Sequence, residues 1–294
     1  MESEIRNHWL ITTSLVYTKR WWDTIQEVDL PKRITEYPGD KRNPFNSIDL
    51  PPKEYLENIR HTEVYTIENS IVNFITSFEV YLFQLTNRII YLKPELIDAS
   101  EMPFEANEIA KAINKSNFRE WFSEKVTNKY IKNKTHLKMI KRLENVIKYE
   151  LYNPNKDLIE EWNKWTYVRN AIVHNGRQVS QDLSSIWSSK FPSKSVDLNL
   201  LERDLVRVHY LAMEIAKRID TIVVTRIIQD ADANLLVREL FVRFGIDNSK
   251  ELAKRVFSTL NHKLKTPMVD KCLGLQRRTN GDIEGWHFTK YNLE

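Results

Sequence analysis

The feature that most constrains the fold is a long helical pattern over residues 53–92, which ends just before Pro94. Its apolar residues recur every three or four positions and so fall on one stripe of a helix. The members of this stripe are Ile71, Ile75, Phe78, Leu82, Leu85 and Ile89. A helix of this length must cover its apolar stripe with other elements. Since the chain has only six glycines and most of its apolar spacing is helical, we predict an all-α fold.

The same spacing predicts further helices along the chain. They cover residues 1–29, 105–113, 116–131, 135–149, 158–174, 200–228, 232–243 and 248–262. Residues 30–52 hold five prolines and read as a linker or long loop, and residues 177–198 also read as a loop. Asn280-Gly281 is a candidate turn of a short hairpin between L-Q-R-R-T and D-I-E-G-W-H-F.

Three segments follow from this pattern. We expect an N-terminal helix with a proline-rich linker over residues 1–52 and a helical bundle over residues 53–228. A small, mainly helical extension follows over residues 229–294.

Residue usage narrows the chemistry. Cys272 is the only cysteine, so an internal disulfide and a zinc site of several thiolates are excluded, and a reducing cytoplasm is expected. The seven histidines are scattered without an H-x-x-x-H pair, so we expect neither a metal nor another cofactor. No run of about 18 apolar residues occurs, so no membrane span is expected.

Positive charge is concentrated in the middle of the chain. Residues 115–150 carry a net charge of +6, whereas the whole chain carries only +4. A basic surface of this kind suits a polyanion, and the alternative is an ordinary solvated helical face.

The stretch W-T-Y-V-R-N-A-I-V-H-N-G-R-Q-V-S, residues 165–180, combines an arginine and a histidine with a helix stop. An Arg followed by a His at this approximate spacing occurs three times, as Arg169–His174, Arg203–His209 and Arg255–His262, so spacing cannot choose between the pairs. Helical geometry favours the first pair. Arg169 falls in the middle of its helix's apolar stripe, formed by Leu158, Trp162, Trp165, Ile172 and Val173, whereas the other two arginines lie off their stripes.

A guanidinium on an apolar face needs an anionic partner or a route to solvent. The alternative to a functional role is a structural salt bridge, or a guanidinium lying over Trp165. Asn170 and His174 share a helix face, so Asn170 is expected to orient the imidazole or to hold a substrate oxygen. His174 lies at the end of the helix, where a reactive group is easily exposed.

The segment R-N-A-I-V-H-N-G resembles the signature of the HEPN (higher eukaryotes and prokaryotes nucleotide-binding) superfamily. Arg169, Asn170 and His174 match that signature position by position. The order of helices over residues 53–228 also resembles a HEPN bundle. Some members carry a tyrosine two residues after the histidine, where this chain has Gly176, so tyrosine-assisted chemistry is not expected.

The resemblance implies an all-α bundle that forms a homodimer and brings two motifs into one cleft. Many members are metal-independent endoribonucleases of toxin–antitoxin or anti-phage systems, and others only bind RNA or nucleotides. By this resemblance Arg169, Asn170 and His174 are the catalytic candidates. RNA is then the substrate, and an antitoxin or defence protein is a possible partner.

Supporting residues follow from the same hypothesis. Glu79, at the edge of the apolar stripe of its helix, is a candidate partner for Arg169, and a solvated carboxylate is the alternative. The candidate RNA contacts are Lys125, Lys129, Lys132, Lys134, Lys138, Lys141, Arg142 and Arg177. Trp121, Tyr130 and Tyr149 are candidate stacking side chains, and core packing is the alternative role expected for most of them. Two other interpretations stay open: a HEPN module that binds RNA or a nucleotide without cleaving it, and a helical interaction or regulatory protein.

Overall fold

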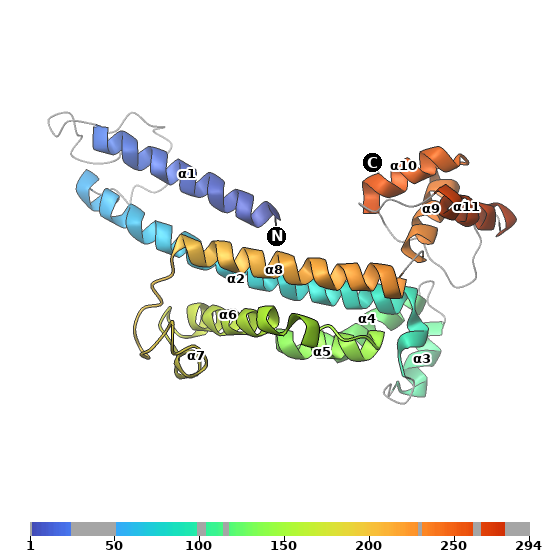
Figure 1. Ribbon diagram of the computed structural model, residues 1–294, viewed down its shortest axis with the longest axis horizontal. Helices are drawn as coiled ribbons and strands as arrows, with labels where there is room; N and C mark the ends of the chain where they lie inside the picture. Colours follow the sequence, from blue (N-terminus) through green and yellow to red (C-terminus); the bar gives the residue numbers. More distant parts are fainter. Residues whose placement is uncertain are drawn as a thin grey trace. The chain divides into compact units, whose positions relative to one another are not determined.

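The structure is a computed structural model that describes residues 2–24, 51–98, 104–113, 118–228, 231–260 and 266–279. Within these ranges the regular structure is helical, apart from one isolated bridge between Gln178 and Asp197, so the all-α class is confirmed (Figure 1). The helices are α1 (Glu2–Thr24), α2 (Pro52–Leu92), α3 (Ala106–Ile113), α4 (Phe118–Ile131), α5 (His136–Ile147), α6 (Lys156–His174), α7 (Gln181–Ile186), α8 (Glu202–Ile222), α9 (Ala231–Phe244), α10 (Ser249–Leu260) and α11 (Thr266–Thr279). A short 3₁₀ turn, Pro94–Leu96, follows α2, another, Asn153–Asn155, precedes α6, and a π-helical segment, Val223–Ile228, extends α8.

The contacts divide the chain into two compact units. The first unit contains residues 1–80 and 155–216, and the second contains residues 81–154 and 217–294. This division differs from the three consecutive segments expected above, because α2 and α8 each contribute residues to both units. Contacts between residues far apart in the sequence decide this division, and the spacing of apolar residues along the chain does not predict such contacts.

The first unit is organised around α6 and the first part of α2. The Phe78 ring lies 4.7 Å from the Trp162 ring, and the Phe74 ring lies 5.3 Å from that of His209 on α8. Apolar side chains on all three helices are fully buried: Ile71, Phe74, Phe78, Ile159, Trp162, Trp165, Val168, Leu205, Val208 and Ala212. At about 25 cal/mol per Å², the burial of these large side chains is the main stabilising contribution in the unit.

The second unit contains two groups of buried residues. One involves α4, α5 and the end of α2, with Leu82, Ile89, Val126, Ile131, Met139, Ile140, Leu143 and Ile147 all buried. The other is formed by α9, α10 and α11, where Leu236, Val237, Leu240, Leu252, Val256, Val269, Cys272 and Leu273 pack together. Cys272, the only cysteine of the chain, is buried within this second group.

Three local expectations need correction. The segment 177–198 is not all loop, because Ser180 caps a helical turn, α7, by accepting a hydrogen bond from the Leu183 amide at 3.1 Å. The segment L-Q-R-R-T belongs to α11, so it is not a hairpin strand, and its proposed partner strand lies outside the described residues. Helix α11 lies outside the helices that the apolar spacing predicts, and it carries Pro267 in its first turn, where a proline is tolerated.

None of the described helices is long and apolar enough to cross a membrane.

Candidate functional site

Helix α6 carries the motif and is fixed in place by its buried face. Ile159, Trp162, Trp165, Val168 and Ala171 are buried along its length. Trp165 also makes an edge contact with Trp187, at 5.0 Å between ring centroids, in the segment that follows α7. Because Trp162 packs against Phe78 and Trp165 against Trp187, the motif side chains are presented from a rigid support.

The buried face of α6 is not where the helical wheel placed it. Its buried residues recur every three positions. Three residues turn about 300°, so each successive buried residue lies about 60° short of the one before it, and the buried face rotates along the helix. At the level of the motif that face therefore lies at Val168 and Ala171, and Val173 is 48% exposed. Arg169 consequently lies at the edge of the buried face, half-buried, and the prediction that it occupies the centre of an apolar stripe is wrong.

The three motif residues lie in the last two turns of α6, outside its buried face. Asn170 and His174 are both exposed. The Arg169 guanidinium donates through Nη1 to Oδ1 of Asn170 at 3.1 Å, so the amide oxygen orients the arginine. Within the part of the chain that the structure describes, no hydrogen bond joins Asn170 to the His174 ring. Asn170 therefore orients the Arg169 guanidinium and not the imidazole.

The carboxylate expected to hold Arg169 does not do so. Glu79 is exposed on α2, and among the described residues Arg169 makes no ion pair with it. Glu79 follows Phe78, whose ring faces Trp162, and neighbouring residues on a helix point about 100° apart. Glu79 therefore does not share the face of α2 on which Phe78 meets α6.

A different carboxylate serves the motif region. Glu68 on α2 is buried, with 5% of its side chain exposed, and its Oε2 lies 2.5 Å from Nη2 of Arg177 and 2.5 Å from Nε. The Arg177 guanidinium also lies over the Tyr65 ring, at 4.8 Å from its centroid. Arg177 was expected to contact RNA, but the structure commits its guanidinium to Glu68 and Tyr65. We call these three residues the Glu68–Arg177 clamp.

The clamp holds the chain directly after His174. Gly176 and Arg177 have φ of +58° and +67°, in the left-handed region that stops a helix. The amides of Asn175 and Arg177 both donate to the Ala171 carbonyl, at 3.1 and 3.2 Å. The Asn175 side-chain amide donates to the Gln178 carbonyl at 2.8 Å. His174 is thus the last residue before a turn that is fixed by backbone bonds and by an ion pair to α2.

Sequence reasoning missed Glu68, although a signal for it exists. Extending the stripe of Ile75 and Ile71 back by one further helical step reaches Glu68, which places a carboxylate at a core position of α2. A buried carboxylate requires a cationic or donor partner. The same wheel test that singled out Arg169 therefore identifies Glu68 when it is applied to acidic residues.

Two of the basic candidates in residues 115–150 are held by named groups of the protein. Arg142 donates to the carbonyl of Tyr130 at 2.9 Å and so caps the end of α4, rather than offering its guanidinium to RNA. Lys125 lies 3.1 Å from Glu108. The remaining five candidates are exposed or, for Lys134, half-buried: Lys129, Lys132, Lys134, Lys138 and Lys141.

No group of three or more potential metal ligands occurs within the described residues. No known family model matches the chain, and neither the curated proteins nor the solved structures give a significant match.

Proposed function

We propose that this protein is a metal-independent endoribonuclease of a toxin or anti-phage defence system, active as a cytoplasmic homodimer. What supports the proposal most is the arrangement at the end of α6, where Asn170 and His174 face solvent beside the half-buried Arg169 on a helix whose other face is packed. The resemblance of R-N-A-I-V-H to the HEPN signature supplies the reaction class.

The residue types suit RNA cleavage without a metal. The reaction requires deprotonation of a 2′-OH, in-line attack on the adjacent phosphorus and protonation of the leaving 5′ oxygen. The products are a 2′,3′-cyclic phosphate and a 5′-OH. In the proposed mechanism His174 moves a proton, since imidazole titrates near neutral pH. Arg169, held by Asn170, places its planar fork against the phosphorane oxygens as negative charge builds.

The dimer assigns separate roles to two copies of the motif. A single histidine cannot act as base and acid at the same instant on opposite sides of the phosphorus. Two copies related by a two-fold axis supply two imidazoles and two guanidiniums to one cleft. In this proposal one His174 takes the 2′-OH proton and the second donates to the leaving oxygen.

The test uses purified protein incubated in EDTA with total RNA and with tRNA. The parent should cleave, and His174→Ala should lose at least about 100-fold in rate, since general acid–base catalysis contributes on that order. His61→Ala, at an exposed position of α2, is the matched control and should cleave as the parent does. End-group analysis should find cyclic phosphates. Equal cleavage by parent and His174→Ala would show that the activity is a contaminant or that the site is elsewhere.

A second candidate function is a module that binds RNA or a nucleotide without cleaving it. The observation that favours it is that Arg169 is bonded to Asn170 and not to any group that would activate His174 within the described chain. RNA bound without cleavage under the conditions above would select this function.

A further inference from the structure

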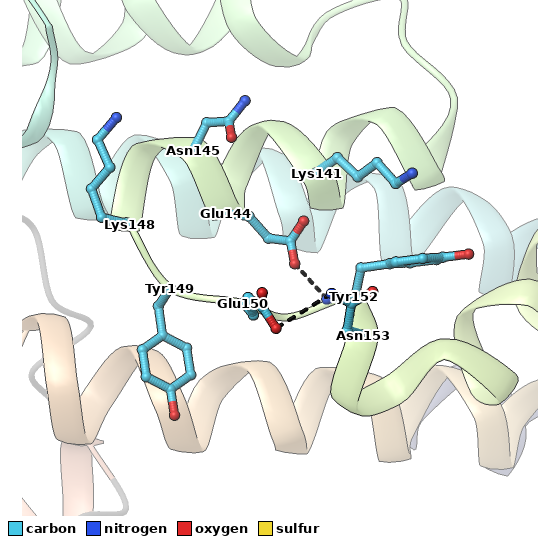
Figure 2. Close-up of a pocket in the computed structure, with 8 residues that line it drawn as sticks. All are labelled: Lys141, Glu144, Asn145, Lys148, Tyr149, Glu150, Tyr152 and Asn153. Carbon is cyan, nitrogen blue, oxygen red and sulfur yellow. Dashed lines mark hydrogen bonds between the residues drawn. The ribbon is translucent and has the colours of Figure 1, made fainter.

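A cavity of about 470 Å³ lies at the C-terminal end of α5 and along the loop that follows it. Eight residues line it: Lys141, Glu144, Asn145, Lys148, Tyr149, Glu150, Tyr152 and Asn153 (Figure 2). All belong to the second unit. Its volume is within the range of pockets that hold small ligands, and its lining combines amines, amides and phenol rings.

Hydrogen bonds to backbone amides fix the shape of the pocket. Lys148 ends α5 in the left-handed conformation, with φ of 53°, and its amide donates to the Glu144 carbonyl. The Glu144 Oε1 accepts hydrogen bonds from the amides of Leu151 and Tyr152 at 2.6 Å each, and Figure 2 shows the bond to Tyr152. The loop therefore keeps one shape, and a ligand meets a preorganised surface.

The carboxylates of the pocket already have donors. Glu144 accepts the two backbone bonds described above, and Glu150 accepts a hydrogen bond from the Asn153 side-chain amide at 3.3 Å. These bonds reduce the repulsion that the two negative charges would exert on an anionic ligand. The lining also carries the positive charges of Lys141 and Lys148.

Those amines belong to one row of α5. Lys138, Lys141, Asn145 and Lys148 recur at helical spacing, and all are exposed. Figure 2 shows Lys141, Asn145 and Lys148 leaving α5 on the same side. The Lys141 amine lies over the Tyr152 ring, at 4.5 Å from its centroid, which restricts the amine to the pocket rim. A row of this kind follows a phosphate backbone.

One aromatic ring at the pocket is open to a base. Tyr149 is 43% exposed, whereas Tyr130 is only 8% exposed and Trp121 lies among the rings of Phe104 and Phe118. Of the three aromatics considered as stacking side chains, Tyr149 is therefore the one whose ring is available. An exposed phenol ring stacks with any unpaired base.

We propose that this pocket binds one unpaired nucleotide of a single-stranded RNA. Lys141 and Lys148 hold the phosphates on its two sides, Tyr149 stacks with its base, and the Asn145 amide reaches the sugar or base edge. The proposal rests on the proposed function, since it supplies the strand on which the ribonuclease acts. It also assigns a role to Lys148, Tyr149 and Asn145, which the motif does not require.

The experiment measures binding of a fluorescent single-stranded oligoribonucleotide to full-length protein in the His174→Ala background. The pair Lys141→Gln/Lys148→Gln should weaken binding by about tenfold or more and lower the slope of log affinity against log salt by about 1.4. The matched control, Lys250→Gln/Lys254→Gln, removes the same charge from exposed positions of α10 and should bind as the parent does. Equal weakening by both pairs would overturn the proposal in favour of diffuse attraction.

The base contact has its own variants. Tyr149→Ala should weaken binding by about tenfold, Tyr149→Phe should retain it, and Tyr17→Ala, at an exposed position of α1, should have no effect. Unchanged binding by Tyr149→Ala would overturn the proposal. An equal loss in Tyr149→Ala and Tyr149→Phe would also overturn it, because stacking does not need the hydroxyl. Titration with a mononucleotide shows whether the pocket also accepts a free nucleotide.

Failure of the pocket and failure of the proposed function give different results. If the motif-intact protein cleaves RNA while the pocket pair binds and cleaves equally well, the pocket proposal fails and the ribonuclease stands. If the motif-intact protein binds RNA through the pocket without cleaving it, the pocket proposal stands and the ribonuclease fails. Absence of any RNA binding overturns both.

Discussion

At the scale of single residues, the motif is presented by groups that are themselves bound. Arg169 is oriented by Asn170, and the chain after His174 is tied to α2 through the Glu68–Arg177 clamp. Of the clamp residues, Glu68 is buried and Arg177 is 41% exposed. Removal of Arg177 therefore leaves a buried carboxylate, whereas removal of Glu68 leaves a guanidinium that is partly exposed to solvent.

The first prediction uses this asymmetry. Arg177→Met leaves a buried, unpaired carboxylate and should lower the free energy of unfolding by about 3 kcal/mol. Glu68→Gln leaves a guanidinium that water can reach and should cost about 1 kcal/mol. Urea unfolding of the parent, both variants and the double variant measures these losses. Glu68→Gln should restore stability to Arg177→Met, because it removes the unpaired buried charge. A double variant less stable than Arg177→Met would contradict this role of Glu68.

A second residue-scale prediction concerns Asp220 in the second unit. The Tyr81 hydroxyl donates to its Oδ1 at 2.7 Å, and burial raises the pKa of Tyr81, so the phenol remains the donor. Burial also raises the pKa of the Asp220 carboxyl, against the opposing effect of that hydrogen bond. The native state therefore binds the proton more tightly than the unfolded chain, and this contribution to stability is lost as pH rises through the folded-state pKa.

Asp220→Asn removes the titration and keeps an oxygen that accepts from Tyr81. Relative to the parent, the variant should gain stability as pH rises from about 4, near the unfolded pKa, to neutral. Urea unfolding over this range measures the difference, with Asp182→Asn at an exposed position as control. A difference that does not change with pH would show that Asp220 titrates as it does in the unfolded chain.

At the scale of secondary-structure elements, the position of a glycine decides its effect. Gly176 stops α6 with φ of +58°, whereas Gly274 lies within α11, and a Cβ at Gly274 would have nothing within 4 Å. Gly176→Ala should cost about 1–2 kcal/mol, because an L side chain is strained in the left-handed region. Gly274→Ala should add up to about 1 kcal/mol, because alanine favours a helix interior.

Thermal unfolding should therefore shift in opposite directions for these two variants. RNA cleavage provides a second measurement for Gly176→Ala, since the turn that Gly176 makes carries His174. If both alanine variants are stabilised, α6 does not end in the left-handed turn described.

At the scale of the whole molecule, the proposed activity depends on a second copy of the chain. If two motifs form one site, the rate per protein should fall on dilution below the dimer dissociation constant, because the fraction of paired chains falls. Light scattering and cleavage assays over the same concentrations should give midpoints that coincide. A monomer that retains full activity per chain at every concentration would rule out the two-motif site.

The sequence alone determined the helical class and the limits of most helices, since both depend on apolar spacing and on local stops. It determined α2 to within one residue at its start, and it located the helix that ends at His174. It also singled out Arg169, Asn170 and His174, whose roles in RNA cleavage stay a prediction. These features depend on residues that are close together in the sequence, so they can be predicted without knowledge of tertiary contacts.

The tertiary structure decided which charged groups meet. Glu68 and Arg177 are 109 positions apart, and their pairing follows from how α6 and α2 pack. The helical wheel placed Arg169 wrongly, because the buried residues of α6 recur every three positions and the buried face therefore turns along the helix. The pocket beside α5 likewise depends on a loop that folds back onto Glu144. Residue spacing does not predict which groups far apart in the sequence will pair, because that depends on how the helices pack.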